Sequence, residues 1–291
     1  MNARYVPWLF LMPAIVIYGI FGAIPIFQTF YMSLTDQVGV AAAGDFVGLE
    51  NYIKLFSDDY FINSLKNTAI WVACFLIVPN SLAIIIALLV KRTFFGAGLI
   101  KTVFFMPLAL SFAIVGVIWG WIYEPDVGLL DQLLVSLGLE SLIVEWLGPH
   151  AGNFSVIAAA AWRQVAFATV IFLAGLSAIP QELIEAAKVD GGTRRQIFFR
   201  VTLPLLKPAT TIAVSSALIQ ALLATEIVLT MTRGGPFGTT EVVGYRMYME
   251  TFWNYKFGYG ASIGVIVTLM TAALVVPYVR RMAKAQEREW G

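Results

Sequence analysis

The sequence predicts an all-α membrane protein with six transmembrane helices. Hydrophobic residues make up 59% of its 291 residues and charged residues only 13%, which is about half of the roughly 25% typical of a soluble domain. The mean hydropathy is +0.80. The apolar residues form continuous runs. Each run is about 20 residues long, which is the length that a helix needs to cross a bilayer. We therefore expect residues 1–291 to form a single transmembrane domain.

Six apolar segments follow one another along the chain. They cover about residues 8–32, 67–90, 102–123, 153–178, 208–232 and 258–279. The fourth segment holds one charged residue, Arg163, and the fifth holds one, Glu226, whereas the other four hold none. The first segment is too long, and is preceded by too few basic residues, to be the apolar part of a cleaved signal peptide. We expect it to be a retained helix.

The distribution of Lys and Arg predicts the orientation, because cytoplasmic segments of membrane proteins carry an excess of both. If the N-terminus is cytoplasmic, 13 of the 19 basic residues lie inside, namely Arg4, Lys91, Arg92, Lys101, Lys188, Arg194, Arg195, Arg200, Lys207, Arg280, Arg281, Lys284 and Arg288. Five lie outside, namely Lys54, Lys66, Arg233, Arg246 and Lys256. We therefore expect both termini to be cytoplasmic.

The outer loops are then at about 36–64, 125–152 and 233–256. The first two contain short amphipathic segments, at 50–56 and 129–137, which we expect to lie on the membrane surface. Aromatic residues, among them Trp71, are expected to mark the ends of the spans, at the depth that amphipathic rings favour.

Several kinds of site are excluded by what the sequence lacks. Its one cysteine, Cys74, allows no disulfide within the chain and no cysteine metal cluster. Its one histidine, His150, has no second metal ligand near it in the sequence. No G-x-x-x-x-G-K-[ST] segment is present, so the chain does not bind and hydrolyse ATP in that manner. We expect no metal or cofactor in this chain and no enzymatic activity of its own.

The cytoplasmic loop at 179–207 has the pattern of two short helices. Pro180 suits a first helical turn, and Gly191 suits a helix end in the left-handed conformation. Thr193 and Gln196 fit a capping box for a second helix, which Pro204 is expected to end. The basic residues of this loop suit a hairpin on anionic lipid. Its acidic residues suit a basic groove on a protein, so these two interpretations stay open on physical grounds.

This loop resembles the cytoplasmic signature of permease subunits of ATP-binding-cassette (ABC) importers. The signature runs Glu-Ala-Ala, three residues, Gly, nine residues, then hydrophobic-x-Leu-Pro. Here it reads Glu185-Ala186-Ala187, Gly191 and Val201-Thr202-Leu203-Pro204. Two positions depart from the usual pattern: Val201 stands in place of Ile, and Gly192 in place of Ala, which is expected to loosen the turn.

The resemblance covers nearly the whole chain and is to the carbohydrate-uptake branch, similar to maltose-type and glycerol-3-phosphate-type permeases. Its other matching segments are Gly48-Leu49-Glu50-Asn51-Tyr52, Asn67-Thr68, Phe105-Met106-Pro107, Trp119, Gly128-Leu129, Trp146-Leu147 and Thr232-Arg233-Gly234-Gly235-Pro236. It implies a type I ABC importer permease fold in a bacterial or archaeal cell membrane, and import of a sugar, polyol or glycerol phosphate by alternating access.

The resemblance also implies partners. They are a second homologous permease subunit, two copies of an ATPase that uses ATP and Mg, an extracytoplasmic solute-binding protein and membrane lipid, with no role for nucleic acid. In this family the loop docks in a cleft of the ATPase and is called the coupling helix. Its contact face would be Glu185, Ala186, Ala187, Asp190 and Gly191.

Polar residues within the spans predict a solute path. An ionisable side chain at the centre of a span costs about 2.5–3.5 kcal/mol on insertion scales, so it faces a partner or a wet cavity. The residues expected to line the path are Trp162, Arg163, Gln164, Gln220, Glu226 and Asn80. The alternative is structural: Arg163 reaches the interface or pairs within the bundle, for example with Glu226, and Asn80 bonds between helices.

The sequence is also compatible with a second function. A stand-alone secondary transporter or channel for a polar solute would also be an apolar helical protein. Such chains usually show repeated halves or acidic residues for ion coupling near the midplane, and here Glu226 is the one acidic residue within a span.

Overall fold

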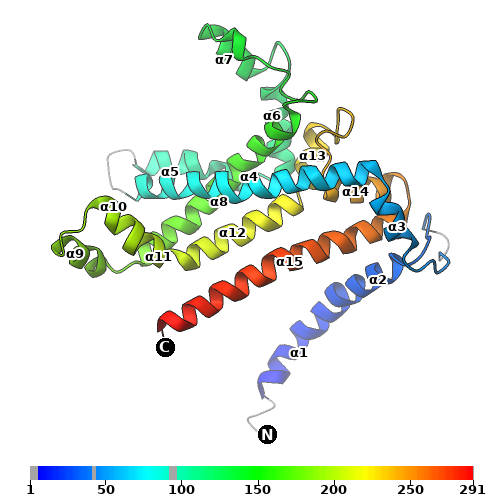
Figure 1. The fold of residues 1–291 in the computed structure, drawn as a ribbon, viewed down its shortest axis with the longest axis horizontal. Helices are drawn as coiled ribbons and strands as arrows, with labels where there is room; N and C mark the ends of the chain where they lie inside the picture. The colour runs from blue at the N-terminus through cyan, green and yellow to red at the C-terminus, as the bar shows by residue number, and fades with distance from the viewer. Residues whose placement is uncertain (1–5, 41–43, 92–96, 291) are drawn as a thin grey trace. The chain divides into compact units, whose positions relative to one another are not determined.

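A computed structural model of the chain describes residues 6–40, 44–91 and 97–290, and their regular structure is helical (Figure 1). The α-helices are α1 Val6–Tyr18, α2 Ile24–Met32, α3 Glu50–Phe56, α4 Asp59–Val90, α5 Ala97–Phe105, α6 Phe112–Ile122, α7 Leu129–Ser136, α8 Gly152–Ala178, α9 Gln181–Val189, α10 Arg194–Ile197, α11 Leu203–Leu205, α12 Lys207–Leu222, α13 Thr225–Met231, α14 Val243–Tyr248 and α15 Phe257–Trp290. The described residues contain one isolated β-bridge, Thr35 with Phe46, and no strand. The all-α prediction is confirmed.

Shorter turns of other helix types join several of these helices. The π-helical segments are η1 Gly19–Ala23, η4 Phe198–Thr202 and η5 Met249–Trp253, and the 3-10 segments are η2 Met106–Ala109 and η3 Glu140–Leu142. The amphipathic segments predicted at 50–56 and 129–137 are the short helices α3 and α7.

Four continuous helical segments of the described chain are long and apolar enough to cross a membrane: Trp8–Met32, Asp59–Val90, Gly152–Ala178 and Phe257–Met282. Two more candidates are bent pairs, Lys101–Ala109 with Phe112–Ile122 and Arg194–Leu205 with Lys207–Leu222. The described chain therefore holds four to six candidate spans. The six-helix count stays a prediction.

The predicted span at 102–123 is not one straight helix, because the chain bends by 112° between η2 and α6. Pro107 lies in the first turn of η2, where its missing N–H costs nothing. The Ser111 hydroxyl then accepts a hydrogen bond from Ile114 N–H at 3.3 Å and caps a new helix. Proline and serine four residues apart thus end one helix and begin the next.

The predicted span at 208–232 is also interrupted, between Leu222 and Thr225. Leu223 and Ala224 leave the helical conformation there, and a Thr225 N–H to Leu223 C=O bond of 2.7 Å closes a tight turn. Neither glycine nor proline marks this break. The second span, in contrast, begins earlier than expected, at Asp59, because the Asp58 carboxylate accepts the Tyr60 N–H at 2.9 Å and caps α4.

The chain divides into two compact units. Unit 1 comprises residues 1–62 and 246–269, and unit 2 comprises residues 63–245 and 270–291, each considered within its described residues. In unit 1, Asn51 connects two segments, because its side-chain amide donates to Ser33 C=O at 3.0 Å and to Thr35 C=O at 2.8 Å. The Ser33 and Tyr52 hydroxyls lie 2.7 Å apart and strengthen the same join.

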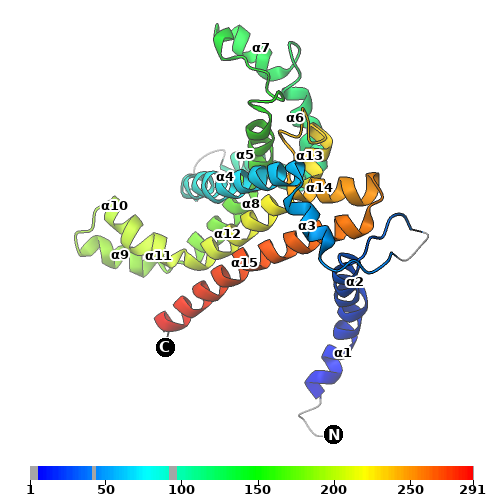
Figure 2. The same ribbon diagram turned by 45° about the vertical axis from the view of Figure 1, so that its right-hand side comes forward.

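Unit 2 is organised around the contact between α8 and α12, which run side by side in Figure 1 and Figure 2. Alanines recur every four residues on α12, at Ala209, Ala213, Ala217 and Ala221, and all four are buried. Small side chains on one helical face let two backbones approach closely, which is how helices associate where lipid removes the hydrophobic driving force. A Cβ placed on Gly175 of α8 would lie 2.6 Å from Ala209 Cβ.

Asparagines at the start of α4 hold the segment that follows α13. The Asn67 amide donates to the Thr239 and Glu241 carbonyls at 3.0 and 2.9 Å, and the Asn63 amide donates to Gly238 C=O at 2.7 Å. The buried Trp71 indole donates to Asn153 Oδ1 at 2.9 Å. Trp71 is therefore a residue of the bundle core, and the prediction that it marks a membrane interface is wrong.

We expect Gly175→Leu to lower the stability of the detergent-solubilised protein, because a large side chain would separate α8 from α12. Overpacking costs about 1–3 kcal/mol, which corresponds to roughly 2–12 °C in melting temperature. Gly120→Leu is the matched control, since a Cβ on Gly120 meets no atom within 4 Å. Equal melting temperatures of the two variants would contradict the tight α8–α12 contact.

Candidate functional site

The loop between α8 and α12 forms the predicted pair of short helices. Helix α9 ends just before Gly191, whose φ of +78° lies in the left-handed region that glycine enters without steric cost. The Thr193 hydroxyl accepts Gln196 N–H at 3.3 Å, and Gln196 Oε1 accepts Thr193 N–H at 2.8 Å. Both the left-handed glycine and the capping box are confirmed.

The second helix ends at Leu205, one residue after Pro204, so the expected stop before the fifth span is confirmed. The helix continues through η4 and α11 to Leu205 and bends by 68° before Lys207. In η4, Leu203 N–H bonds to Phe198 C=O five residues back. Pro204 follows Leu203 in the first turn of α11, where its missing N–H is tolerated.

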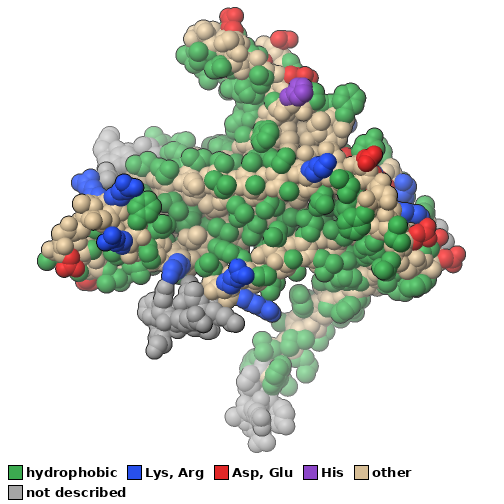
Figure 3. Space-filling view, in the orientation of Figure 1, with side chains coloured by type: hydrophobic (Ala, Val, Ile, Leu, Met, Phe, Trp, Pro, Cys, Tyr) green, Lys and Arg blue, Asp and Glu red, His purple; other side chains and the backbone are tan. Residues whose placement is uncertain are grey.

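The face predicted to contact an ATPase is accessible. Glu185, Ala186, Asp190 and Gly191 are exposed, and Ala187 is half-buried. Beside this face is a notch of about 330 Å³, lined by Asp190, Gly191 and Arg200 among others. Figure 3 shows basic side chains around this end of α9–α11 and acidic side chains at its tip. Exposed groups of both signs are available to a partner.

Gly192 is fixed by its neighbours in the turn. Its N–H donates to Ala187 C=O at 3.0 Å, and a Cβ added to Gly192 would lie 2.7 Å from that oxygen. The expectation that glycine at this position loosens the turn is therefore wrong, because the close approach of the two backbone segments leaves no room for a side chain.

The base of the loop is firmly attached to the bundle. Lys91, just after α4, donates from its ammonium to Leu176 C=O at 2.8 Å. This carbonyl is one of the last four of α8, which lack helical partners and carry the negative end of the helix dipole. Leu206 is fully buried in the same core cluster as Leu176, and Ile179 packs against that cluster. Because of these contacts, a displacement of the loop would also displace α8 and α12.

A cavity of about 180 Å³ lies within unit 2, between α4, α6, α8, α12 and α13. Its lining combines aromatic rings with one amide and one carboxylate: Trp71, Phe75, Phe112, Ala160, Gln220, Leu223, Ala224, Glu226 and Ile227. The Trp71 and Phe75 rings lie 5.4 Å apart with 30° between their planes. Gln220 and Glu226, which the sequence singles out, are thus brought together at one cavity.

The aromatic residues of this cavity are not among the path residues predicted from the sequence. Trp71 and Phe75 are four residues apart on α4, so they share one helical face. That spacing is the signal in the sequence that could have identified them. Phe112 begins α6 after the bend, and no pattern in the sequence points to it.

Arg163 is held by the break between η2 and α6. Its Nε donates to Leu110 C=O at 2.7 Å, and its guanidinium carbon lies 4.5 Å from the centre of the Phe112 ring. Within the described residues no ion pair joins Arg163 to Glu226, so the suggested pairing is wrong. The bend leaves a backbone carbonyl without a helical donor, and the guanidinium supplies one.

Asn80 has an equally local explanation. Pro79 has no N–H, so it cannot donate to Phe75 C=O four residues earlier. The Asn80 side-chain amide donates to that carbonyl at 3.2 Å and to Leu76 C=O at 2.9 Å. It thereby stabilises α4 at its proline.

The remaining predicted path residues lie outside the cavity lining. Trp162, 37% exposed, meets Trp119 edge-on with ring centres 5.9 Å apart. Gln164 is buried, and its Nε2 donates no hydrogen bond within the described residues. Across the same described ranges, His, Cys, Asp and Glu nowhere gather in a group of three that could hold a metal ion.

Residues 80–284 match the family described as "Binding-protein-dependent transport system inner membrane component". The chain belongs to this family.

Curated relatives match this permease over nearly its full length. A probable ABC transporter permease of Pyrococcus horikoshii is 34% identical over 284 residues, which cover 96% of both chains. The sn-glycerol-3-phosphate transport system permease protein UgpA of Agrobacterium fabrum is 32% identical and covers 97% of the permease. The alpha-glucoside transport system permease protein AglF of Rhizobium meliloti is also 32% identical, over 96% of the permease and 82% of its own length.

Solved structures show the same architecture. A chain of a bacterial ABC transporter that imports the acidic polysaccharide alginate superposes on the permease with a TM-score of 0.83, covering 96% of each chain at 21% identity. The all-helical fold is thus that of a type I ABC importer permease, as the sequence resemblance implies.

Proposed function

We propose that this permease carries a neutral polyhydroxylated solute, a sugar or a polyol, into the cell by alternating access. The observation that carries the proposal is the cavity in which the Trp71 and Phe75 rings accompany Gln220 and Glu226. Rings can stack on the apolar face of a sugar, while an amide and a carboxylate bond to its hydroxyls. Relatives named for alpha-glucosides and for diacetylchitobiose support this solute class.

The charge of the cavity favours a neutral solute over a glycerol phosphate. Glu226 is the one ionisable group in its lining, and a carboxylate repels a phosphate. Arg163, whose guanidinium lies over the lining residue Phe112, already donates to Leu110 C=O. A phosphate would therefore meet repulsion here without a compensating positive charge.

We further propose that the α9 loop couples the permease to a separate ATPase. The exposed Glu185 face, the rigid turn at Gly191 and the Lys91 anchor to α8 support this role. Closure of an ATPase pair would move the loop and reorient the bundle between inward-facing and outward-facing states. ATP and Mg belong to that partner.

The complete transporter is proposed to contain this permease, a homologous second permease, two ATPase copies and an extracytoplasmic binding protein. Six spans with both termini inside would place the segment after α13 outside the cell. That segment is held by Asn63 and Asn67, and it presents Phe237 with 93% of its surface exposed. We assign it to contact the binding protein. The family match supports this assembly over a stand-alone secondary transporter.

Glu185→Lys and Gly191→Val are expected to leave the transporter assembled while lowering uptake at least tenfold relative to ATP hydrolysis. The first reverses a charge at the proposed contact, and the second strains a left-handed turn. Uptake and ATPase rates in proteoliposomes measure the ratio. The matched controls are Glu140→Lys and Gly138→Val, an exposed glutamate and another left-handed glycine in the loop beyond α6. Normal coupling in both test variants would contradict the assignment.

Gln220→Ala and Glu226→Gln are expected to reduce sugar uptake without loss of protein from the membrane. A lost hydrogen bond costs about 0.5–1.5 kcal/mol, and one to a charged group about 1.5–3 kcal/mol, so the reductions should be roughly threefold to tenfold and tenfold to hundredfold. Ile219→Ala, at an exposed neighbour on α12, is the control. Unchanged uptake in both variants would remove the cavity from the solute path.

Phe237→Ala is expected to weaken stimulation of the ATPase by the binding protein. Truncation of an aromatic hot spot at the centre of an interface costs about 2 kcal/mol or more, equivalent to a roughly thirtyfold higher half-maximal concentration. Titration of the binding protein against the reconstituted transporter measures this shift. Phe154→Ala serves as control, because Phe154 is an exposed aromatic at the start of α8. An identical titration for both variants would place the contact elsewhere.

A further inference from the structure

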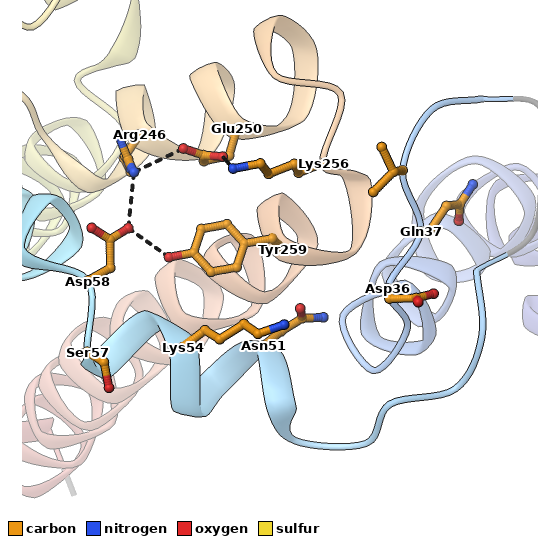
Figure 4. Close-up of a pocket in the computed structure, with 11 residues that line it drawn as sticks. Asp36, Gln37, Asn51, Lys54, Ser57, Asp58, Arg246, Glu250, Lys256 and Tyr259 are labelled. Carbon is orange, nitrogen blue, oxygen red and sulfur yellow. Dashed lines mark hydrogen bonds and ion pairs between the residues drawn. The ribbon is translucent and has the colours of Figure 1, made fainter.

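Unit 1 contains a larger and much more polar hollow, with a volume of about 620 Å³. Small-molecule pockets typically measure about 300–1,000 Å³. Figure 4 shows the loop that carries Asp36 and Gln37 on one side of this hollow, and Lys256 and Tyr259 on the other. We call it the unit 1 pocket. It is separate from the cavity at Gln220 and Glu226.

One wall of the unit 1 pocket is a chain of paired charges. Arg246 Nη2 lies 3.0 Å from Asp58 Oδ2 and 3.0 Å from Glu250 Oε1, and Lys256 Nζ lies 3.4 Å from Glu250 Oε2. The Tyr259 hydroxyl donates to Asp58 Oδ2 at 2.8 Å. The Glu250 side chain is 3% exposed and that of Arg246 16%. Breaking a buried pair is costly, so this wall is rigid.

The same contacts keep Asp58 ionised. Burial opposes its charge, but the hydrogen bond from Tyr259 and the charge of Arg246 outweigh that effect, so the pKa of Asp58 lies below its usual value. Asp58 therefore stays charged in the neutral pH range.

Two groups at the pocket keep unused hydrogen-bonding capacity. The Gln37 side-chain amide, which can both donate and accept, lines the pocket and makes no hydrogen bond within the described residues. The Lys256 ammonium has one partner at 3.4 Å and a side chain that is 56% exposed. Donors and acceptors thus face the pocket together, which suits hydroxyl groups because each hydroxyl can donate and accept.

The unit 1 pocket is lined by equal numbers of acidic and basic side chains. Its lining holds three carboxylates, from Asp36, Asp58 and Glu250, and three cations, from Lys54, Arg246 and Lys256. A phosphate or carboxylate ligand would need an excess of positive charge, which this lining lacks. A neutral ligand rich in hydroxyls meets these conditions without such an excess.

We propose that the unit 1 pocket is a low-affinity binding site for a neutral polyhydroxylated solute, distinct from the cavity in the bundle. The basic-residue distribution places its loops on the extracytoplasmic side. The inference rests on the proposed function, because it gives the same solute class a second site on this permease.

Protection of an introduced thiol tests the site. In the complete transporter in liposomes, with Cys74→Ala as background, Gln37→Cys would be labelled from outside by a membrane-impermeant maleimide. The probes are maltose, glucose and glycerol as neutral compounds and sn-glycerol 3-phosphate as the anion. We expect at least one neutral probe to slow labelling threefold or more, saturably and in the millimolar range, with no such effect of the anion.

Ser136→Cys on α7 is the control, because it is exposed and lies outside the pocket lining. It should label equally with and without probe. Should Gln37→Cys fail to assemble, Val38→Cys replaces it, since Val38 lines the pocket and is 65% exposed. Three results would overturn the proposal: no protection by any neutral probe, equal protection by the anion, or no labelling from outside.

ATP-driven uptake by the unmodified transporter keeps the two proposals apart. Normal sugar uptake without thiol protection removes the unit 1 pocket and leaves the proposed function standing. Thiol protection without ATP-driven sugar uptake removes the proposed function and leaves the unit 1 pocket standing. Adding Lys256→Met to Gln37→Cys should raise the probe concentration for half-maximal protection at least threefold, because it removes one charged donor.

Discussion

The structure depends on side-chain donors for backbone carbonyls that breaks and ends of its apolar helices leave without a helical N–H. In a membrane no water is available to supply such a donor, and an unsatisfied group costs several kcal/mol. Three polar side chains provide these donors. Arg163 serves Leu110 where η2 gives way to α6, Asn80 serves Phe75 where Pro79 cannot donate, and Lys91 serves Leu176 near the end of α8. Irregular helices are possible here because these side chains donate hydrogen bonds to main-chain carbonyls.

This arrangement separates structural polar residues from the ones left for a solute. Arg163 and Asn80 are occupied by the backbone, whereas Gln220 and Glu226 line a cavity together with aromatic rings. In unit 1 a similar division holds. Arg246 is committed to two carboxylates, whereas Gln37 and Lys256 keep capacity facing a hollow. A polar residue therefore indicates where a ligand fits only if it lines a cavity and keeps hydrogen-bonding groups that the protein does not use.

The parts predicted well from sequence are those set by neighbours along the chain. Apolar runs located the continuous helices, and Thr193 with Gln196 located a helix start, because caps and spans depend on a few adjacent residues. The role of Arg163 could not be predicted, since its partner carbonyl lies 53 residues away. No glycine or proline marks the break after Leu222 in the sequence. The unit 1 pocket joins residues about two hundred positions apart, and nothing local signals that meeting.

The alanine face of α12 has a mechanical consequence. Small side chains let α8 and α12 pack closely near Gly175 and Ala209, so the two helices would turn as one stiff rod. The rod begins beside the α9 loop and ends where Gln220 and Leu223 line the cavity. Helix α12 has 16 residues, which at about 1.5 Å each is a length of roughly 24 Å. A tilt of about 10° at the loop would thus move the cavity wall by about 4 Å, close to the width of a sugar ring.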